Sequence, residues 1–186
     1  MTDVLELAKY LLCLDKEKAC ADGEAASDVT PLKLQKLLYY CQGYSLGLYG
    51  EPLFGDAIEA WDHGPVIPGV YRLYKEFGGG HIPFETGEEP DVDERAKKIA
   101  RLVLEDKGKF APWALRDMTH SEKPWAHTYR SAGRNAQIPQ SLIRDFFLSR
   151  FEEELSPEEE KALFSRSGPV PAAEEWGKIN EYVRAL

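Results

Sequence analysis

The feature that most constrains this chain is a helix whose two ends are both marked in the sequence between residues 30 and 50. Thr30 is a helix-capping residue, and Pro31 fits the first helical position, where a missing N–H costs no hydrogen bond. Apolar side chains then recur at helical spacing until Gly50 and Pro52 end the segment. These signals make the segment the clearest helix in the chain. The predicted stripe consists of Leu34, Leu37, Leu38, Cys41, Ser45 and Leu48.

Other segments also carry helical signals, and one short segment carries strand signals. Residues 53–61 separate large apolar side chains by small or charged ones, which predicts one or two brief strands. Gly64-Pro65 then breaks the chain, and three glycines after residue 77 end the next helix. The predicted fold class is mainly α, a compact multi-helix domain with a small β element. Further helices are expected at about residues 3–14, 68–77, 96–108, 112–115, 121–125 and 139–151, with residues 15–28 as a polar connection.

Composition and charge narrow the kind of protein. Hydrophobic residues make up 43% of the 186 and charged residues 30%, the balance of a soluble globular protein. No apolar run is long enough to cross a membrane and residues 1–14 do not resemble a secretion signal, so we expect a cytoplasmic protein without a membrane partner. The three cysteines lack short metal-ligand spacings and are expected to be reduced thiols. A net charge of −9 argues against direct binding of nucleic acid.

Three blocks of sequence carry a family resemblance. They are TPLKLQKLLYYCQGYSLGLYGEPLF (30–54), IEAWDHGPVIPGVYRLYKEFG (58–78) and THSEKPWAHTYR (119–130). In order and spacing these blocks resemble the Panacea domain family, also described as SocA-like antitoxins and phage-associated proteins. The resemblance covers roughly residues 1–150 and implies a predominantly helical antitoxin domain with a small β element. Residues 1–152 are therefore expected to form the Panacea domain, and residues 153–186 an acidic C-terminal helical extension.

The same resemblance implies a function. Such a domain is expected to be the antitoxin of a type II toxin–antitoxin system, bacterial or phage-encoded, that binds and neutralises a protein toxin encoded by the adjacent gene. It implies no enzymatic activity and no cofactor. Two alternatives remain open: an adaptor that presents the toxin to a cytoplasmic protease, or a phage-borne regulator that binds a host protein.

Aromatic residues are the first candidates for contact with a partner. Tyrosines and tryptophans are numerous enough, and spread over enough helix faces, that some are expected to be exposed, where they give large rigid contact areas. For any one of them, a half-buried place in the core is the competing interpretation. The predicted partner-binding residues are Tyr39, Tyr40, Tyr44, Trp61, Asp62, His63, Tyr71, Tyr74, His120, Trp125 and Trp176.

Asp62 and His63 could also suggest acid–base chemistry. Adjacent residues on a strand point apart, however, and do not form a dyad on one face. We therefore expect a structural role in the turn before Gly64-Pro65, by hydrogen bonds to the backbone, with partner contact as the alternative. No catalytic residue is predicted.

Three other chemical motifs are rejected. Residues 43–47 match GxSxG, but Ser45 lies inside a capped helix rather than at a strand-to-helix turn, and the two glycines are expected to let another element approach closely. The histidines and cysteines lack the spacings of a zinc site, so no metal is predicted. The glycines at 78–80 follow a helix and lack the lysine of a phosphate-binding loop.

The C-terminal segment carries much of the negative charge. Residues 151–186 contain nine glutamates against four basic residues. A capping pattern at Ser156 and an apolar side containing Trp176 predict helices there. The segment could pack on its own domain, or order on a basic toxin, and the sequence leaves both open.

Overall fold

The computed structural model describes residues 1–21, 29–83 and 90–154. These residues form seven α-helices, one 3-10 helix and a small antiparallel sheet, which confirms the predicted mainly α class. No helix among them is both long and apolar enough to cross a membrane. The elements are α1 (Val4–Ala21), α2 (Pro31–Tyr49), β1 (Glu59–Trp61), β2 (Gly64–Val66), α3 (Pro68–Tyr74), the 3-10 helix η1 (Lys75–Phe77), α4 (Glu94–Lys107), α5 (Pro112–Ser121), α6 (Lys123–Ala132), β3 (Ala136–Gln137) and α7 (Gln140–Glu154).

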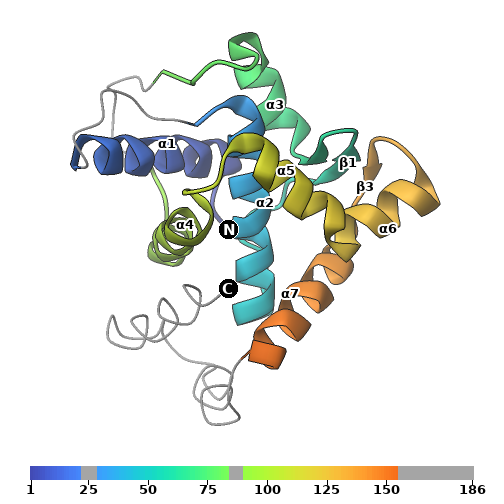
Figure 1. Cartoon of the computed structure of the whole chain (residues 1–186). Coiled ribbons are helices and arrows are strands. Elements are labelled where there is room, and N and C mark those ends of the chain that lie inside the picture. The colour runs from blue at the N-terminus through green and yellow to red at the C-terminus, as the bar shows by residue number, and fades with distance from the viewer. Residues whose placement is uncertain (22–28, 84–89, 155–186) are drawn as a thin grey trace.

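Helix α2 is the centre of the fold, with α1, α4, α5 and α7 around it (Figure 1). Its predicted ends are confirmed: the Thr30 hydroxyl accepts a hydrogen bond from the Lys33 N–H at 3.3 Å, and Gly50 ends the helix with φ 69°. The sequence predicted one buried face for this helix, but every residue from Lys33 to Leu48 is buried. The neighbouring helices and strand β2 pack on it from several sides.

Polar side chains on α2 are buried because each bonds a loop or turn. Lys33 donates to the Gly108 carbonyl at 2.6 Å, and the Gln35 side chain accepts from the Ile67 N–H at 2.7 Å. Gln42 bonds both Leu53 and Phe54 of the segment after the helix. These bonds satisfy loop backbone that would otherwise be buried unpaired.

Helix α7 packs against α2 at two glycines, as the sequence predicted for residues 43–47. A Cβ atom placed on Gly43 would overlap the ring of Phe147, and one on Gly47 would lie 2.8 Å from the ring of Phe151. The absence of side chains at these positions therefore lets the aromatic residues of α7 reach the α2 backbone.

The sheet differs from the prediction. The strand predicted at 53–61 is confined to residues 59–61, because the backbone at 53 and 54 bonds the Gln42 side chain instead of another strand. Gly64-Pro65, predicted as a break, begins β2, which pairs with β1. The two-residue strand β3 completes the order β2-β1-β3 and was not predicted.

Several helix lengths were also wrong. Helix α1 continues from the Asp3 cap to Ala21, past the predicted end near Leu14, because residues 15–21 are charged or small helix formers without Gly or Pro. Helices α5 and α6 have ten residues each, longer than predicted. Helix α7 ends at Glu154, and the predicted helices around Ser156 and Trp176 lie outside the described residues.

Candidate functional site

Asp62 and His63 form the two-residue loop of the β1–β2 hairpin. The register pairs Trp61 with Gly64, so the predicted turn role is confirmed. We expected the Asp62 side chain to bond the adjacent backbone. Its carboxylate instead accepts a hydrogen bond from the Tyr129 hydroxyl at 2.7 Å and pairs with Arg134 at 2.5 Å. These bonds tie the hairpin to α6 and the loop after it.

A stack of aromatic rings lies behind this hairpin. The ring of Trp125 lies between His120, at a centroid distance of 3.7 Å, and Tyr129, at 4.7 Å. Its indole N–H donates to the Trp61 carbonyl at 2.9 Å, and the Trp61 ring contacts Tyr71 of α3 edge to face. These contacts fix side chains of β1, α3, α5 and α6 against one another. The four elements lie next to one another in the fold (Figure 1).

Trp113 of α5 is the exposed large apolar residue beside the hairpin. Its side chain is 59% exposed, and its ring contacts the imidazole of His63 edge to face at 5.5 Å. It was not among the predicted partner-binding residues. The sequence did hold a signal, because Trp113 lies two residues from the buried Leu115, on roughly the opposite side of a helix. The name hairpin cluster is used below for Trp61, Asp62, His63, Tyr71, Trp113, His120, Trp125 and Tyr129.

The hairpin cluster contains six of the eleven predicted partner-binding residues. Tyr39, Tyr40 and Tyr44 are instead buried on α2, in the core, which is the competing interpretation of such residues. They are covered because α7 packs its phenylalanines on the same part of α2. Tyr74 is half-buried and lines a separate groove of about 810 Å³ beside α1, and Trp176 lies outside the described residues.

The three buried tyrosines belong to a polar network that the sequence did not reveal. The hydroxyls of Tyr39 and Tyr40 both donate to the Glu122 carboxylate at 2.9 Å, and that of Tyr44 donates to Asp106 at 2.5 Å. Burial raises the pKa of Glu122. Glu122 joins α5 to α6, so this network fixes the base of the hairpin cluster.

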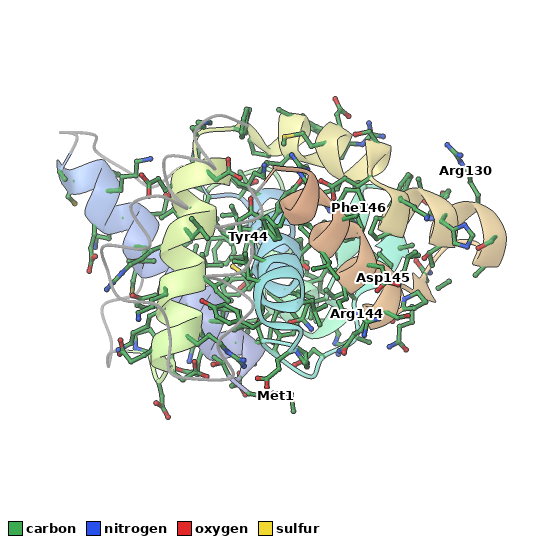
Figure 2. The ribbon with its side chains drawn as sticks, turned by 90° about the horizontal axis from the view of Figure 1, so that it is seen from below. Met1, Tyr44, Arg130, Arg144, Asp145 and Phe146 are labelled. Carbon is green, nitrogen blue, oxygen red and sulfur yellow. The ribbon has the colours of Figure 1, made fainter. Side chains whose placement is uncertain are left out.

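Two basic side chains next to this network pair with its carboxylates. Lys107 bonds Asp106 at 2.8 Å, and its ammonium lies 5.1 Å from the centre of the Tyr40 ring. Arg150 of α7 approaches Glu122 at 3.8 Å. Tyr44 of α2 lies in the interior, whereas Arg130 projects outward from α6 (Figure 2).

Basic groups accumulate where α5 meets the hairpin. Lys36 is fully buried and donates to the Pro65 carbonyl at 2.8 Å, and burial, with Arg116 nearby, lowers its pKa to about 7. Burial, Arg116 and Lys36 lower the pKa of His120 to about 4. The Nε2 of His120 is buried without a hydrogen-bond partner among the described residues.

Replacing His120 should change the response of the protein to acid. Since the pKa of His120 is about 4 in the folded state against 6.5 as reference, the unfolded chain binds the proton first as the pH falls. Its contribution to stability is thus present at pH 7 and lost towards pH 4. His120→Phe keeps a ring on Trp125 but has no proton to bind. Its free energy of unfolding should therefore fall by about 1 kcal/mol less than that of the wild type between about pH 7 and pH 5, allowing for solvent screening. Urea unfolding at the two pH values measures this, and equal losses in both proteins would contradict it.

The serine and cysteine residues that were rejected as catalytic or metal-binding candidates lie in structural positions. Ser45 is buried within α2, and its hydroxyl donates to the Glu51 carbonyl at 2.8 Å, so it is not displayed as a nucleophile. Cys13, Cys20 and Cys41 form no disulfide; Cys20 is exposed and Cys41 is buried. Within residues 1–21, 29–83 and 90–154, no three metal-ligating side chains are grouped so as to hold an ion.

Comparisons with known proteins place the chain in a family. The family described as Antitoxin SocA-like, Panacea domain, matches residues 34–126, which run from α2 to the first turns of α6. Antitoxin SocA of Caulobacter vibrioides is 31% identical over 148 residues, covering 68% of this chain and 77% of that protein. No solved structure matches the chain. The chain is thus a member of the SocA-like antitoxin family that carries the Panacea domain.

Proposed function

We propose that this protein is the antitoxin of a type II toxin–antitoxin system, and that it neutralises a protein toxin by direct contact through the hairpin cluster. The toxin is the product of the adjacent gene, and both proteins act in the cytoplasm. The observation that carries the proposed surface is Trp113, a large apolar side chain that is 59% exposed beside an ordered set of rings.

The hairpin cluster has the properties of a preformed binding site. The Trp61 ring contacts Tyr71, and the rings of His63 and Trp113 contact each other, so less side-chain freedom is left to lose when a partner docks. Exposed tryptophan surrounded by polar side chains is typical of the residues that contribute most to binding. Asp62, His63 and Arg134 would form such a polar rim.

The arrangement favours binding over catalysis. The Asp62 carboxylate is occupied by Tyr129 and Arg134 and does not orient His63 as a base. Ser45 is buried in a helix. A non-enzymatic role without a cofactor is consistent with both.

Trp113→Ala should weaken toxin binding by about 2 kcal/mol, or roughly 30-fold, because it removes the exposed anchor. In cells that express the product of the adjacent gene, this variant should rescue growth poorly while wild-type protein rescues it fully. The free energy of unfolding should change little, since the side chain is mostly in solvent.

Leu73→Ala is the matched control, because Leu73 is 49% exposed on α3 and lines the separate groove beside α1. It should rescue growth like the wild type. Full rescue by Trp113→Ala would contradict toxin binding at the hairpin cluster. If the product of the adjacent gene does not harm cells that lack this protein, the antitoxin proposal is wrong. The toxin's half-life separates plain occlusion from delivery to a protease, since occlusion leaves it unchanged.

A further inference from the structure

A row of basic side chains continues from Trp113 along α5 and α6. Within each helix its members are three or four residues apart, the spacing of neighbours on one side of a helix, and the extended residue Glu122 separates the α5 members from the α6 members. They are Arg116 and His120 on α5 and Lys123, His127 and Arg130 on α6, called the basic stripe below; His120, with a pKa of about 4, is uncharged at pH 7. The stripe begins one helical turn after Trp113, so it extends the hairpin cluster on one side.

The α6 part of the stripe lines an open groove of about 580 Å³. Lys123, His127 and Arg130 are exposed there, and two hydroxyl side chains, Ser121 and Ser131, lie at the groove as well. Figure 2 shows Arg130 reaching outward from the helix. The groove therefore offers cations together with small hydrogen-bonding groups.

The positive charge of this groove is not balanced within the described part of the chain. No carboxylate there pairs with Lys123 or Arg130, and Glu122, the acidic residue next to them, turns inward to the tyrosines of α2. The Nε of Arg116 is buried without a hydrogen-bond partner among the described residues, and its Nη1 bonds Asp117 at 2.6 Å. Such a stripe on a protein with a net charge of −9 is a local reversal of charge.

We propose that the basic stripe binds an acidic polypeptide segment of the toxin, next to the contact that the toxin makes with Trp113. This inference rests on the proposed function and adds the chemistry of the partner. An acidic helix with carboxylates at three- and four-residue intervals would match the spacing of Lys123, His127 and Arg130 on α6. The Ser121 and Ser131 hydroxyls donate to the Met118 and His127 carbonyls, and their oxygens can still accept hydrogen bonds from backbone N–H groups of such a segment.

Charge favours a polypeptide over nucleic acid as the occupant. The exposed α6 cations span Lys123 to Arg130, about 10 Å of helix. A DNA duplex carries a charge about every 1.7 Å and would place many phosphates against the remaining acidic surface. A short acidic peptide segment would place its negative charges only against the cations of the stripe.

The test is a fluorescence-anisotropy titration of the full-length protein with a labelled glutamate-rich peptide. The glutamine counterpart of the peptide and labelled single-stranded and duplex DNA serve as comparison probes. The glutamate peptide should bind more tightly than its glutamine counterpart, and Lys123→Glu/Arg130→Glu should weaken its binding at least about tenfold. Lys123→Gln/Arg130→Gln should give an intermediate loss, and thermal unfolding checks that each variant is folded.

Arg72→Glu/Lys75→Glu is the matched control, because it makes the same change of charge on exposed residues of α3 and η1. It should leave peptide binding unchanged. An equal loss in this control would assign the effect to overall charge, and absence of peptide binding would overturn the inference. DNA binding that exceeds peptide binding and is lost in Lys123→Glu/Arg130→Glu would assign the stripe to nucleic acid instead.

The growth assay separates this inference from the proposed function. If Trp113→Ala fails to rescue cells while Lys123→Glu/Arg130→Glu rescues them fully, the stripe is not part of the toxin contact and the proposed function stands. Failure of both variants, with rescue by Arg72→Glu/Lys75→Glu, supports both proposals.

Discussion

Gly43→Ala should destabilise the protein by about 2 kcal/mol, although alanine favours a helix over glycine by about 1 kcal/mol. The added methyl group would overlap the ring of Phe147, which packs directly on the α2 backbone. That ring also contacts Tyr39, Tyr40 and Tyr44, so it has little room to move. Urea unfolding of the wild type and variant measures the difference.

Gly69→Ala is the matched control for this prediction. Gly69 also lies inside a helix, α3, but nothing is within 4 Å of the position that its Cβ would take. This variant should be as stable as the wild type or slightly more stable. A double variant with Phe147→Leu should recover part of the loss at Gly43, whereas a Gly43→Ala protein as stable as Gly69→Ala would show that α7 does not pack on α2 as described.

Glu122→Ala should cost about 3 kcal/mol. It removes the acceptor of two buried tyrosine hydroxyls, and each buried donor left without a partner costs about 1–3 kcal/mol. It also leaves Arg150 without the carboxylate that lies 3.8 Å away. Chemical denaturation gives the free energy, and the near-ultraviolet spectrum should report loosened tyrosines.

Glu122→Gln distinguishes loss of an acceptor from loss of charge. Its amide oxygen can still accept from Tyr39 or Tyr40, and since burial raises the pKa of Glu122, a neutral side chain is easier to bury. We expect this variant to lose about 1 kcal/mol or less. A loss equal to that of Glu122→Ala would mean that the charge, through Arg150 and Lys107, is the main contribution.

Local signals in the sequence predicted the elements that depend on local physics. The cap at Thr30, the stop at Gly50 and the prolines that open α3, α5 and α7 act within a few residues, so the helix starts were found. Strand β3 has two residues and depends on pairing with β1, which lies far away in sequence. No local pattern marks such a strand.

The candidate site was only partly accessible to such reasoning. Trp61 and His120 were identified because tryptophan and histidine stand out in the sequence. Whether a given aromatic residue lies at the surface or in the core depends on tertiary packing. Tyr39 and Tyr40 bind Glu122, more than eighty residues away, and no spacing rule connects them. Burial of these tyrosines, and exposure of Trp113, follow from where α7 and α5 dock.

Core and surface are coupled in this fold. Glu122 holds two tyrosines of α2 and is also the residue before α6, which carries Trp125 and the basic stripe. Variants of the core should therefore lower toxin neutralisation by lowering the amount of folded protein, whereas Trp113→Ala should lower it without loss of stability. Measuring both quantities for each variant separates the two causes.

The central claim, that the protein neutralises its toxin by direct contact at the hairpin cluster, is tested most directly by hydrogen exchange of the purified protein with and without the product of the adjacent gene. The account predicts a stable complex in which amide exchange slows at residues 61–63 and 113–131. Failure of the two proteins to bind, or slowed exchange confined to the groove between α1 and α3, would contradict it.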